Sequence, residues 1–408
     1  MPWVGLALLV GTACRSEPPR EAAAVAEAPA KTPSETPVAS RAPASVDHAR
    51  LEDSPPGAGS LLSSLITPNP LVSRGKPAFG FSPKEWAKPG AVDDGVYLQH
   101  KGTWFGGMPT AATPSWVAID VGRGPSRVYL AWTASADTNY DGTMYGAPGA
   151  YHLDVSADST HGDDGTWKRV ATVTDNHVRT RGHSFDFSGQ RWVKIVITSP
   201  PGVSPNGVSF DEIDVHDVSA GASDTWFFFG DSITAKAFDR KTPERQPSFA
   251  EQIHQKHPRY FPAMINGGVG GEWSKGGAKR IDECLRQNPD ARFWAIGYGT
   301  NDASGNRSDT KEFASNMRDI IQRVKDAGRV PIVAKIPYST DGSHQNVPAY
   351  NAVIDQLTIE SHLTPGPDLY SWFVAHPDQL LDGVHPNDPG SIAMNRLWAE
   401  AVDRLYGP

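Results

Sequence analysis

The sequence has little cysteine, no cluster of basic residues and no apolar run long enough to cross a bilayer. Its two cysteines, Cys14 and Cys284, lie far apart, so they offer neither a disulfide framework nor a cysteine-based metal site. The net charge of −8 argues against nucleic acid as a partner. The hydrophobic fraction is 38%, which is low for 408 residues and indicates segments that contribute nothing to a core.

The only membrane-directed stretch is the apolar run that begins at Val4. It is far shorter than the ~20 residues of a membrane-spanning helix and has the length of a signal-peptide apolar region. Its end, Gly-Thr-Ala-Cys at residues 11–14, resembles a bacterial lipobox, in which the cysteine receives lipid after cleavage. No Lys or Arg precedes the run and Gly11 stands where leucine is usual, so plain secretion and an incidental apolar N-terminus stay as alternatives.

From this stretch we expect a lipoprotein-type signal peptide over residues 1–13 and a lipid anchor on Cys14. The protein would then be exported and held at the outer membrane or cell surface, with a periplasmic or secreted form as the alternative. Residues 14–60 are rich in Ala, Pro, Glu and Ser and have almost no large apolar side chain. Such a composition predicts a disordered spacer.

Two patterns of apolar residues divide the rest of the chain. Over residues 65–219 apolar residues alternate with a period of two, as in WVAIDVG at 116–122, and turn residues separate the runs. This pattern predicts an antiparallel β-sandwich. The segments YHLDVSADS, GTWKRV, RWVKIVI and VSFDEIDV, in that order, resemble galactose-binding-like, discoidin-type jelly rolls.

From residue 224 to the end, short apolar runs alternate with helical stripes. Buried strands are predicted at 226–229, 262–265, 293–296 and 330–336. Before the last of them, one helix carries its apolar residues on one face and stops at Gly328: Phe313, Met317, Ile320, Ile321 and Val324. Strands and helices in alternation predict a parallel sheet covered by helices on both faces. The chain is therefore expected to be multidomain, with a β-sandwich followed by an α/β domain.

Four short motifs follow the predicted strands or precede the last helix. In open α/β sheets, ligands bind beyond the carboxyl ends of the strands. The motifs there are Gly-Asp-Ser at 230–232, Asn-Gly-Gly-Val-Gly-Gly at 266–271, Gly-Thr-Asn-Asp at 299–302 and Asp-Gly-Val-His at 382–385. In this order they resemble the SGNH, or GDSL, hydrolase family, over residues 224–405. The resemblance implies a flavodoxin-like α/β/α domain that hydrolyses esters with no metal or organic cofactor.

The residue types in these motifs suit acyl transfer. A serine hydroxyl needs a base to become a nucleophile, and we expect Ser232 and His385 to take these two roles. Asp382 would hold the imidazole in the right tautomer. The resemblance assigns the oxyanion hole to the backbone N–H groups of Ser232 and Gly268 and to the side-chain amide of Asn301.

Several structural interpretations compete with these roles. Asp231 or Ser232 could simply cap a helix after the strand, and we expect Asp231 to be such a cap and Asp302 to fix a loop. Asp382 could be a turn residue only, which would leave a Ser–His dyad. Three other histidines are possible bases that we set aside in favour of His385: His344, His362 and His376.

Glu272 and Trp273 directly follow the second motif and Tyr298 directly precedes the third, so we expect them to line the acyl or sugar pocket. For Trp273, packing under the loop is the alternative. The leading prediction is a serine esterase that removes short acyl groups, most often acetyl, from a carbohydrate. It rests on the resemblance of a jelly roll before an SGNH domain to certain carbohydrate esterases. The alternatives are a lipase or thioesterase and an inactive carbohydrate-binding lipoprotein. The four intact motifs argue against the inactive form.

Overall fold

The structure is a computed structural model that describes residues 66–97, 103–134, 146–200 and 207–407. The predicted signal peptide, the lipidated Cys14 and the spacer over residues 14–60 lie outside the described residues. All described residues belong to one unit of the chain, Pro55–Pro408.

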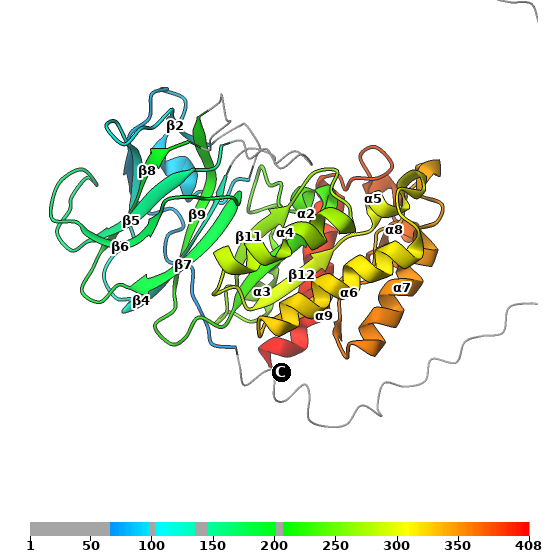
Figure 1. Cartoon of the computed structure of the whole chain (residues 1–408). Coiled ribbons are helices and arrows are strands. Elements are labelled where there is room, and N and C mark those ends of the chain that lie inside the picture. Colours follow the sequence, from blue (N-terminus) through cyan, green and yellow to red (C-terminus); the bar gives the residue numbers. More distant parts are fainter. Residues whose placement is uncertain (1–65, 98–102, 135–145, 201–206, 408) are drawn as a thin grey trace, which may run out of the picture. The chain divides into compact units, whose positions relative to one another are not determined.

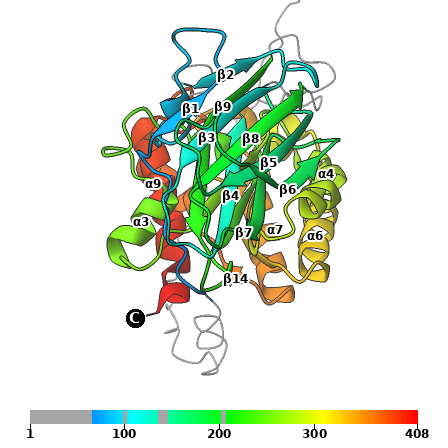
Figure 2. The ribbon, with the colours of Figure 1, turned by 90° about the vertical axis from the view of Figure 1, so that its left-hand side faces the viewer.

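The N-terminal region contains two antiparallel sheets, which confirms the predicted β-sandwich (Figures 1 and 2). One sheet has the order β1-β3-β8-β5-β6 and the other the order β2-β9-β4-β7. The strands are β1 (Ala78–Gly80), β2 (Trp104–Gly107), β3 (Ser115–Asp120), β4 (Arg127–Ala134), β5 (Ala150–Ser156), β6 (Lys168–Val173), β7 (Thr180–Asp186), β8 (Trp192–Ser199) and β9 (Val208–Asp217), with a 3-10 turn η2 (Pro89–Val92). The likeness to discoidin-type jelly rolls stays a prediction.

Strand β4 contributes to two cores. Val128, Leu130 and Trp132 belong to the core between the two sheets of the sandwich. Tyr129 and Ala131, which point the other way because side chains alternate along a strand, belong to a core shared with the α/β domain. The outer face of this sheet is therefore covered by the second domain.

The C-terminal domain contains a parallel sheet, as predicted. It has five strands, one more than expected, in the order β11-β10-β12-β13-β14. Its strands are β10 (Thr225–Gly230), β11 (Ala263–Gly268), β12 (Phe293–Gly297), β13 (Val330–Val333) and β14 (Thr364–Pro365). The prediction of a strand over 330–336 was too long, because β14 pairs only with Ile332 and Val333. Beyond them the Ile336 N–H donates to the side chain of Asn351 instead.

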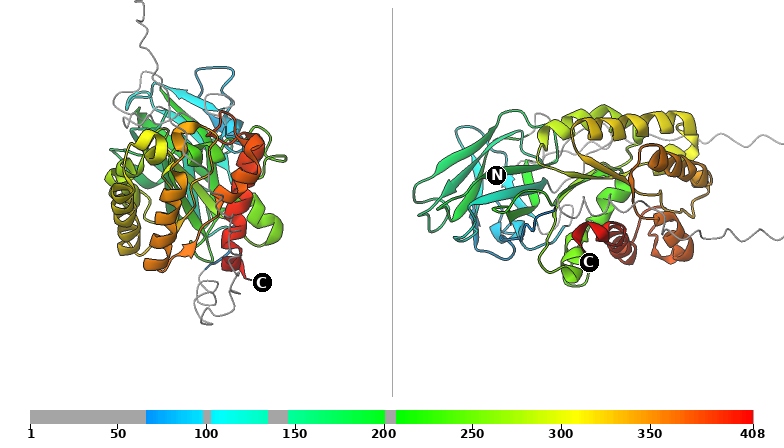
Figure 3. Two further views of the ribbon diagram at one scale, coloured as in Figure 1. Left: turned by 90° about the vertical axis from the view of Figure 1, so that its right-hand side faces the viewer. Right: turned by 90° about the horizontal axis from the view of Figure 1, so that it is seen from below.

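Helices cover both faces of this sheet (Figure 3). One core includes residues of α4 (Ser274–Gln287), α6 (Thr310–Asp326) and α7 (Val347–Glu360). The other includes residues of α2 (Ser232–Ala237), α3 (Phe249–Lys256), α8 (Leu369–Ala375) and α9 (Asp388–Val402). The shorter elements are α5 (Thr300–Ala303), η3 (Ser304–Asn306), η4 (Gly342–His344), η5 (Pro377–Gln379) and η6 (Asp403–Tyr406).

The central strand β10 explains the run of aromatic residues before the first motif. Trp226 and Phe228 pack into one core, and Phe227 and Phe229 into the other. A strand between two neighbours in a sheet covered on both faces has no solvent side, so every residue of β10 is buried. The strand thereby holds the turn at Gly230 rigidly.

A buried carboxyl at the start of β10 makes stability depend on pH. Asp224 accepts hydrogen bonds from the Trp226 indole and the Tyr406 hydroxyl, each at 2.9 Å. Burial raises the pKa of Asp224 to about 7, although these two hydrogen bonds act in the opposite direction. Asp224 therefore keeps a proton in the folded protein that the unfolded chain loses near pH 4, and its contribution to stability is lost as pH rises from about 4 to 7.

We expect Asp224→Asn to remove this dependence, since an amide keeps the shape and does not titrate. The free energy of unfolding of the variant relative to wild type should rise between pH 5 and 7, by at most about 1.4 kcal/mol per pH unit. Urea unfolding of both proteins at the two pH values measures this. A relative stability that is constant across that range would contradict the account.

Candidate active site

Ser232 is the first residue of helix α2 and stands directly after the central strand. Asp231 caps this helix, because its Oδ1 accepts a 2.9 Å hydrogen bond from the Ile233 N–H. The cap is thus the aspartate, as expected, and the serine side chain is left for another partner. Its Oγ lies 2.8 Å from Nε2 of His385.

The other ring nitrogen of His385 faces Asp382. Nδ1 lies 2.8 Å from Asp382 Oδ2, and Oδ1 of the same carboxylate accepts from the N–H groups of His385 (2.8 Å) and Val384 (3.0 Å). Burial alone would raise the pKa of Asp382, but these hydrogen bonds outweigh it and lower the pKa to about 2. The carboxylate therefore stays ionised and fixes the Nδ1–H tautomer, so that Nε2 faces the serine as an acceptor.

Asn301 lies in α5, and its side-chain amide donates to the Glu272 carbonyl at 2.9 Å. One amide hydrogen thereby fixes the side chain, and the amide has a second hydrogen to donate.

Gly268 does not match its predicted role. It is the last residue of β11, and its N–H donates to Oδ1 of Asn266 at 3.1 Å instead of standing free for an oxyanion. A side chain there would run into the backbone of Ala235 in α2, with Cβ only 2.8 Å from its Cα. The glycine is therefore explained by the close approach of α2.

Glu272 and Tyr298 are likewise not at the surface of the site. Only 8% of Glu272 and 2% of Tyr298 is exposed. The Tyr298 hydroxyl donates to Glu272 Oε2 at 2.5 Å, and the Arg280 guanidinium donates to both carboxylate oxygens and to the hydroxyl. The expectation that these two residues bind substrate is corrected: burial and a salt bridge occupy their polar atoms.

Arg280 is a residue that the sequence reasoning missed. Its Nη2 donates to the carbonyls of Gly230 (3.3 Å), the last residue of β10, and Gly267 (2.8 Å), the last but one of β11. Burial alone would lower the pKa of Arg280, but Tyr298 and Glu272 outweigh it and raise the pKa. No sequence signal marks this arginine, because it stands among other charged residues in α4.

Asp302 and Trp273 lie on the same loops. Asp302 accepts from the Ser274 N–H (2.9 Å), the Ser274 hydroxyl (2.5 Å) and the Ser308 hydroxyl (3.1 Å), which is the loop-fixing role expected of it. Trp273 is partly buried and immediately precedes α4, with the Lys275 ammonium 5.6 Å from its ring centre.

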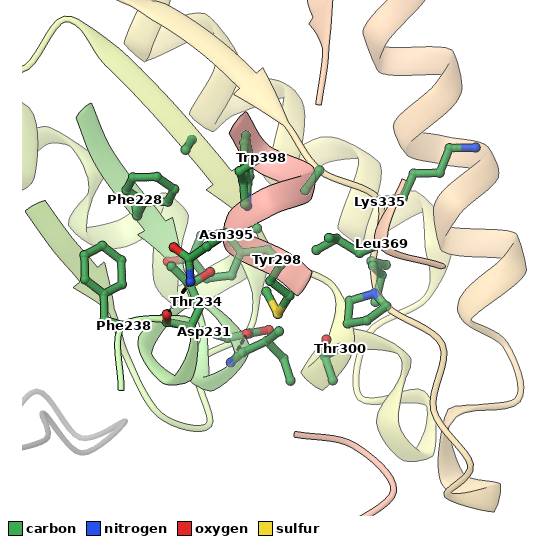
Figure 4. A pocket seen from close by; sticks show the side chains of 18 residues that line it. Phe228, Asp231, Thr234, Phe238, Tyr298, Thr300, Lys335, Leu369, Asn395 and Trp398 are labelled. Atoms are coloured by element: carbon green, nitrogen blue, oxygen red, sulfur yellow. Dashed lines mark hydrogen bonds between the residues drawn. The ribbon is translucent and has the colours of Figure 1, made fainter. Parts of the chain in front are cut away.

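A small cavity lies beside the turn that carries Ser232. It holds about 30 Å³, and Figure 4 shows its lining, which includes Asp231 and Thr234 at the start of α2 and Asn395 and Trp398 from α9. Oδ2 of Asp231 is buried and has no partner among the described residues, and burial raises the pKa of this carboxyl to about 8. The space is about that of one water molecule, so it does not offer room for an acyl chain.

The three rival histidines do not contact Ser232 in the part of the chain that is described. His362 follows the C-cap of α7 and has a left-handed φ of 51°, and His376 packs on Trp372 with 4.1 Å between ring centres. His344 is different, because Asp341 stands three residues before it and gives it an Asp-x-x-His context of its own.

Over the described ranges, no group of three or more His, Cys, Asp or Glu side chains is arranged to hold a metal ion. Within the same ranges, no helix is long and apolar enough to cross a membrane.

Residues 228–391 match the model of the GDSL-like Lipase/Acylhydrolase family. A lipase/acylhydrolase from Enterococcus faecalis is 22% identical, with 44% of this chain and 94% of that chain covered and a TM-score of 0.37. Axe2, an acetylxylan esterase from Geobacillus stearothermophilus, is 19% identical over 45% and 94%, with a TM-score of 0.36. A chitosan-binding module from Paenibacillus sp. IK-5 is 21% identical over 36% and 98%, with a TM-score of 0.28. No curated protein matches the chain.

The match to the family model shows that the C-terminal domain is a GDSL/SGNH acylhydrolase domain, and the chain is a carboxylic ester hydrolase. The structural likenesses are too distant to carry an argument about the substrate.

The buried position of Tyr298 can be tested by Tyr298→Phe. Loss of the hydroxyl leaves Glu272 with one donor fewer, so the free energy of unfolding should fall by about 1–3 kcal/mol while KM for an ester stays within about twofold. Chemical unfolding and steady-state kinetics measure the two effects. A folded variant of unchanged stability with a KM raised tenfold would return Tyr298 to the substrate pocket.

Proposed function

We propose that this ester hydrolase removes short acyl groups, with acetyl preferred, from a carbohydrate, with Ser232 as nucleophile, His385 as general base and Asp382 as the group that orients the base. The observation that carries the chemistry is the unbroken chain from Ser232 Oγ through both nitrogens of His385 to Asp382, with 2.8 Å at each link. This favours a triad over a dyad.

The reaction follows from this chain. His385 Nε2 takes the hydroxyl proton as Ser232 Oγ attacks the acyl carbon, and the same nitrogen then gives the proton to the leaving alcohol. A water molecule next loses a proton to Nε2 and attacks the acyl-serine, which releases the acid and restores the hydroxyl. The ionised Asp382 stabilises the imidazolium that forms in each half of the cycle.

The oxyanion of each tetrahedral intermediate needs donors. The Ser232 N–H and the second amide hydrogen of Asn301 are the proposed ones. A backbone N–H of the turn at Gly270 and Gly271 would complete the set, because this turn adjoins the Glu272 carbonyl that holds Asn301. The Gly268 N–H is already engaged by Asn266.

One observation supports a polar alcohol. The residues exposed on the neighbouring loops include Arg307, Asp341 and Ser343, which can hydrogen-bond to hydroxyl groups. One observation favours longer acyl esters instead: Leu381, directly before Asp382, is 68% exposed and would give an alkyl chain an apolar contact.

A chain-length series separates these two substrates. With 4-nitrophenyl esters, we expect kcat/KM to fall by roughly tenfold or more from acetyl to octanoyl, since a chain that stays in water gains none of the ~0.8 kcal/mol per buried methylene. Ser232→Ala, which should lose nearly all activity, supplies the blank. If octanoyl esters are cleaved with the higher kcat/KM, the lipase function replaces the one proposed.

The N-terminal sequence supports a further part of the proposal, namely that the enzyme is exported and tethered to a membrane through lipid on Cys14. Expressed in a bacterium, the wild type should incorporate radiolabelled palmitate and Cys14→Ser should not. Wild-type protein that is cleaved before Cys14 but carries no label would leave plain secretion as the route.

A further inference from the structure

The sequence contains Asp-Gly-x-His twice. The first copy is Asp341–His344 and the second is the catalytic Asp382–His385. Only the second contributes a base to Ser232 in the structure, so the first copy has no role in the mechanism above.

The two copies lie against each other. The carbonyl of Gly383, inside the catalytic copy, accepts from the Thr340 N–H at 2.9 Å and from the Ser339 hydroxyl at 2.7 Å. A side chain at Gly383 would meet the Thr340 hydroxyl at 2.6 Å, so the loops are in close contact. The first copy therefore adjoins the loop that carries Asp382 and His385.

The same copy also adjoins the loop of the proposed oxyanion donor. Its 3-10 turn η4 (Gly342–His344) packs against α5, which carries Asn301, and against η3. The hydroxyls of Ser343 and Ser304 lie 3.4 Å apart across this contact. His344 thus stands on a segment between the catalytic histidine loop and the Asn301 loop.

Hydrogen bonds within the first copy define the state of its histidine. The Ser343 hydroxyl donates to Asp341 Oδ2 at 3.1 Å, and hydrogen bonds led by the Ser343 N–H lower the pKa of Asp341, which is therefore an ionised acceptor. Because the single proton of that hydroxyl is used, the hydroxyl accepts from His344 Nδ1, 3.0 Å away. This fixes the Nδ1–H tautomer and leaves Nε2 as an acceptor.

The imidazole of His344 stays neutral, and no described residue uses its acceptor, Nε2. Burial lowers the pKa of His344; the nearby Asp341 opposes this effect, and the charges of His385 and Arg307 reinforce it. Only 7% of the residue is exposed, and among the described residues none bonds to Nε2. A neutral Nε2 beside the catalytic loop can accept a hydrogen bond from a hydroxyl group. Because the ring carries no charge, it does not disfavour the imidazolium form of His385.

We propose that His344 is a specificity-determining residue whose Nε2 accepts a hydrogen bond from a hydroxyl group on the alcohol part of the ester, beside the ester oxygen. The inference rests on the proposed function, since it needs a polyhydroxylated alcohol such as a sugar. The first Asp-Gly-x-His copy then recognises the alcohol, and the second copy carries the chemistry.

The test compares two esters, an acetylated methyl glycoside with free hydroxyls beside the ester and 4-nitrophenyl acetate, which has none. The quantity is the ratio of kcat/KM for the glycoside to that for the aryl ester. His344→Leu should lower this ratio by roughly tenfold, chiefly through a higher KM for the glycoside. His344→Gln, whose amide oxygen can accept, should restore part of it.

The matched control is His177→Leu, a change to a histidine whose side chain is 58% exposed on the sandwich, and it should leave the ratio unchanged. Ser343→Ala, which frees the tautomer, should also lower the ratio. If His344→Leu does not fold, an unchanged ratio in folded Ser343→Ala overturns the inference.

An unchanged ratio in folded His344→Leu, or equal losses on both esters, overturns the inference while the proposed function stands. A wild type that cleaves the aryl ester but no acetylated glycoside overturns the proposed substrate class, and the inference with it.

Discussion

The geometry of the site depends on one partly buried guanidinium. Arg280 donates to the carbonyls of Gly230, the last residue of β10, and Gly267, the last but one of β11, and is itself held by Glu272 and Tyr298. Both carbonyls lie within motifs, so the arginine ties the turn that carries Ser232 to the loop of the second motif. A charge withdrawn from water needs its partners, and removing one of them would leave the others unpaired.

The parts of the structure that could be predicted from the sequence are those that local patterns determine, and the contacts of Arg280 are not among them. Strand periodicity and helical stripes gave the two-domain fold because they report burial directly: β10 is buried on both faces, and the helix of Phe313 to Val324 runs as expected. The catalytic side chains could be proposed because their types and order are constrained by chemistry. Glu272 and Tyr298 could not be placed, because their burial depends on an arginine on a different element that no local pattern marks.

The roles of Gly268 and His344 also depend on neighbours that are distant in the sequence. The sequence indicates that a glycine is needed after the second strand but not whether the reason is a ligand or a neighbouring helix, and the structure gives Ala235 as the neighbour. For His344 the Asp-x-x-His pattern was present in the sequence, yet only the packing of Thr340 on Gly383 shows that the two copies lie against each other. A chain with one catalytic copy and one recognition copy would bind both sides of the ester with the same short motif.

The central claim is that Ser232 is the nucleophile activated by His385. Labelling with a serine-directed fluorophosphonate, followed by peptide mass spectrometry, tests it most directly. The account predicts one label per molecule, on Ser232, that forms in step with loss of esterase activity and is absent in His385→Ala. A label on another serine, or full inactivation with Ser232 unmodified, would contradict it.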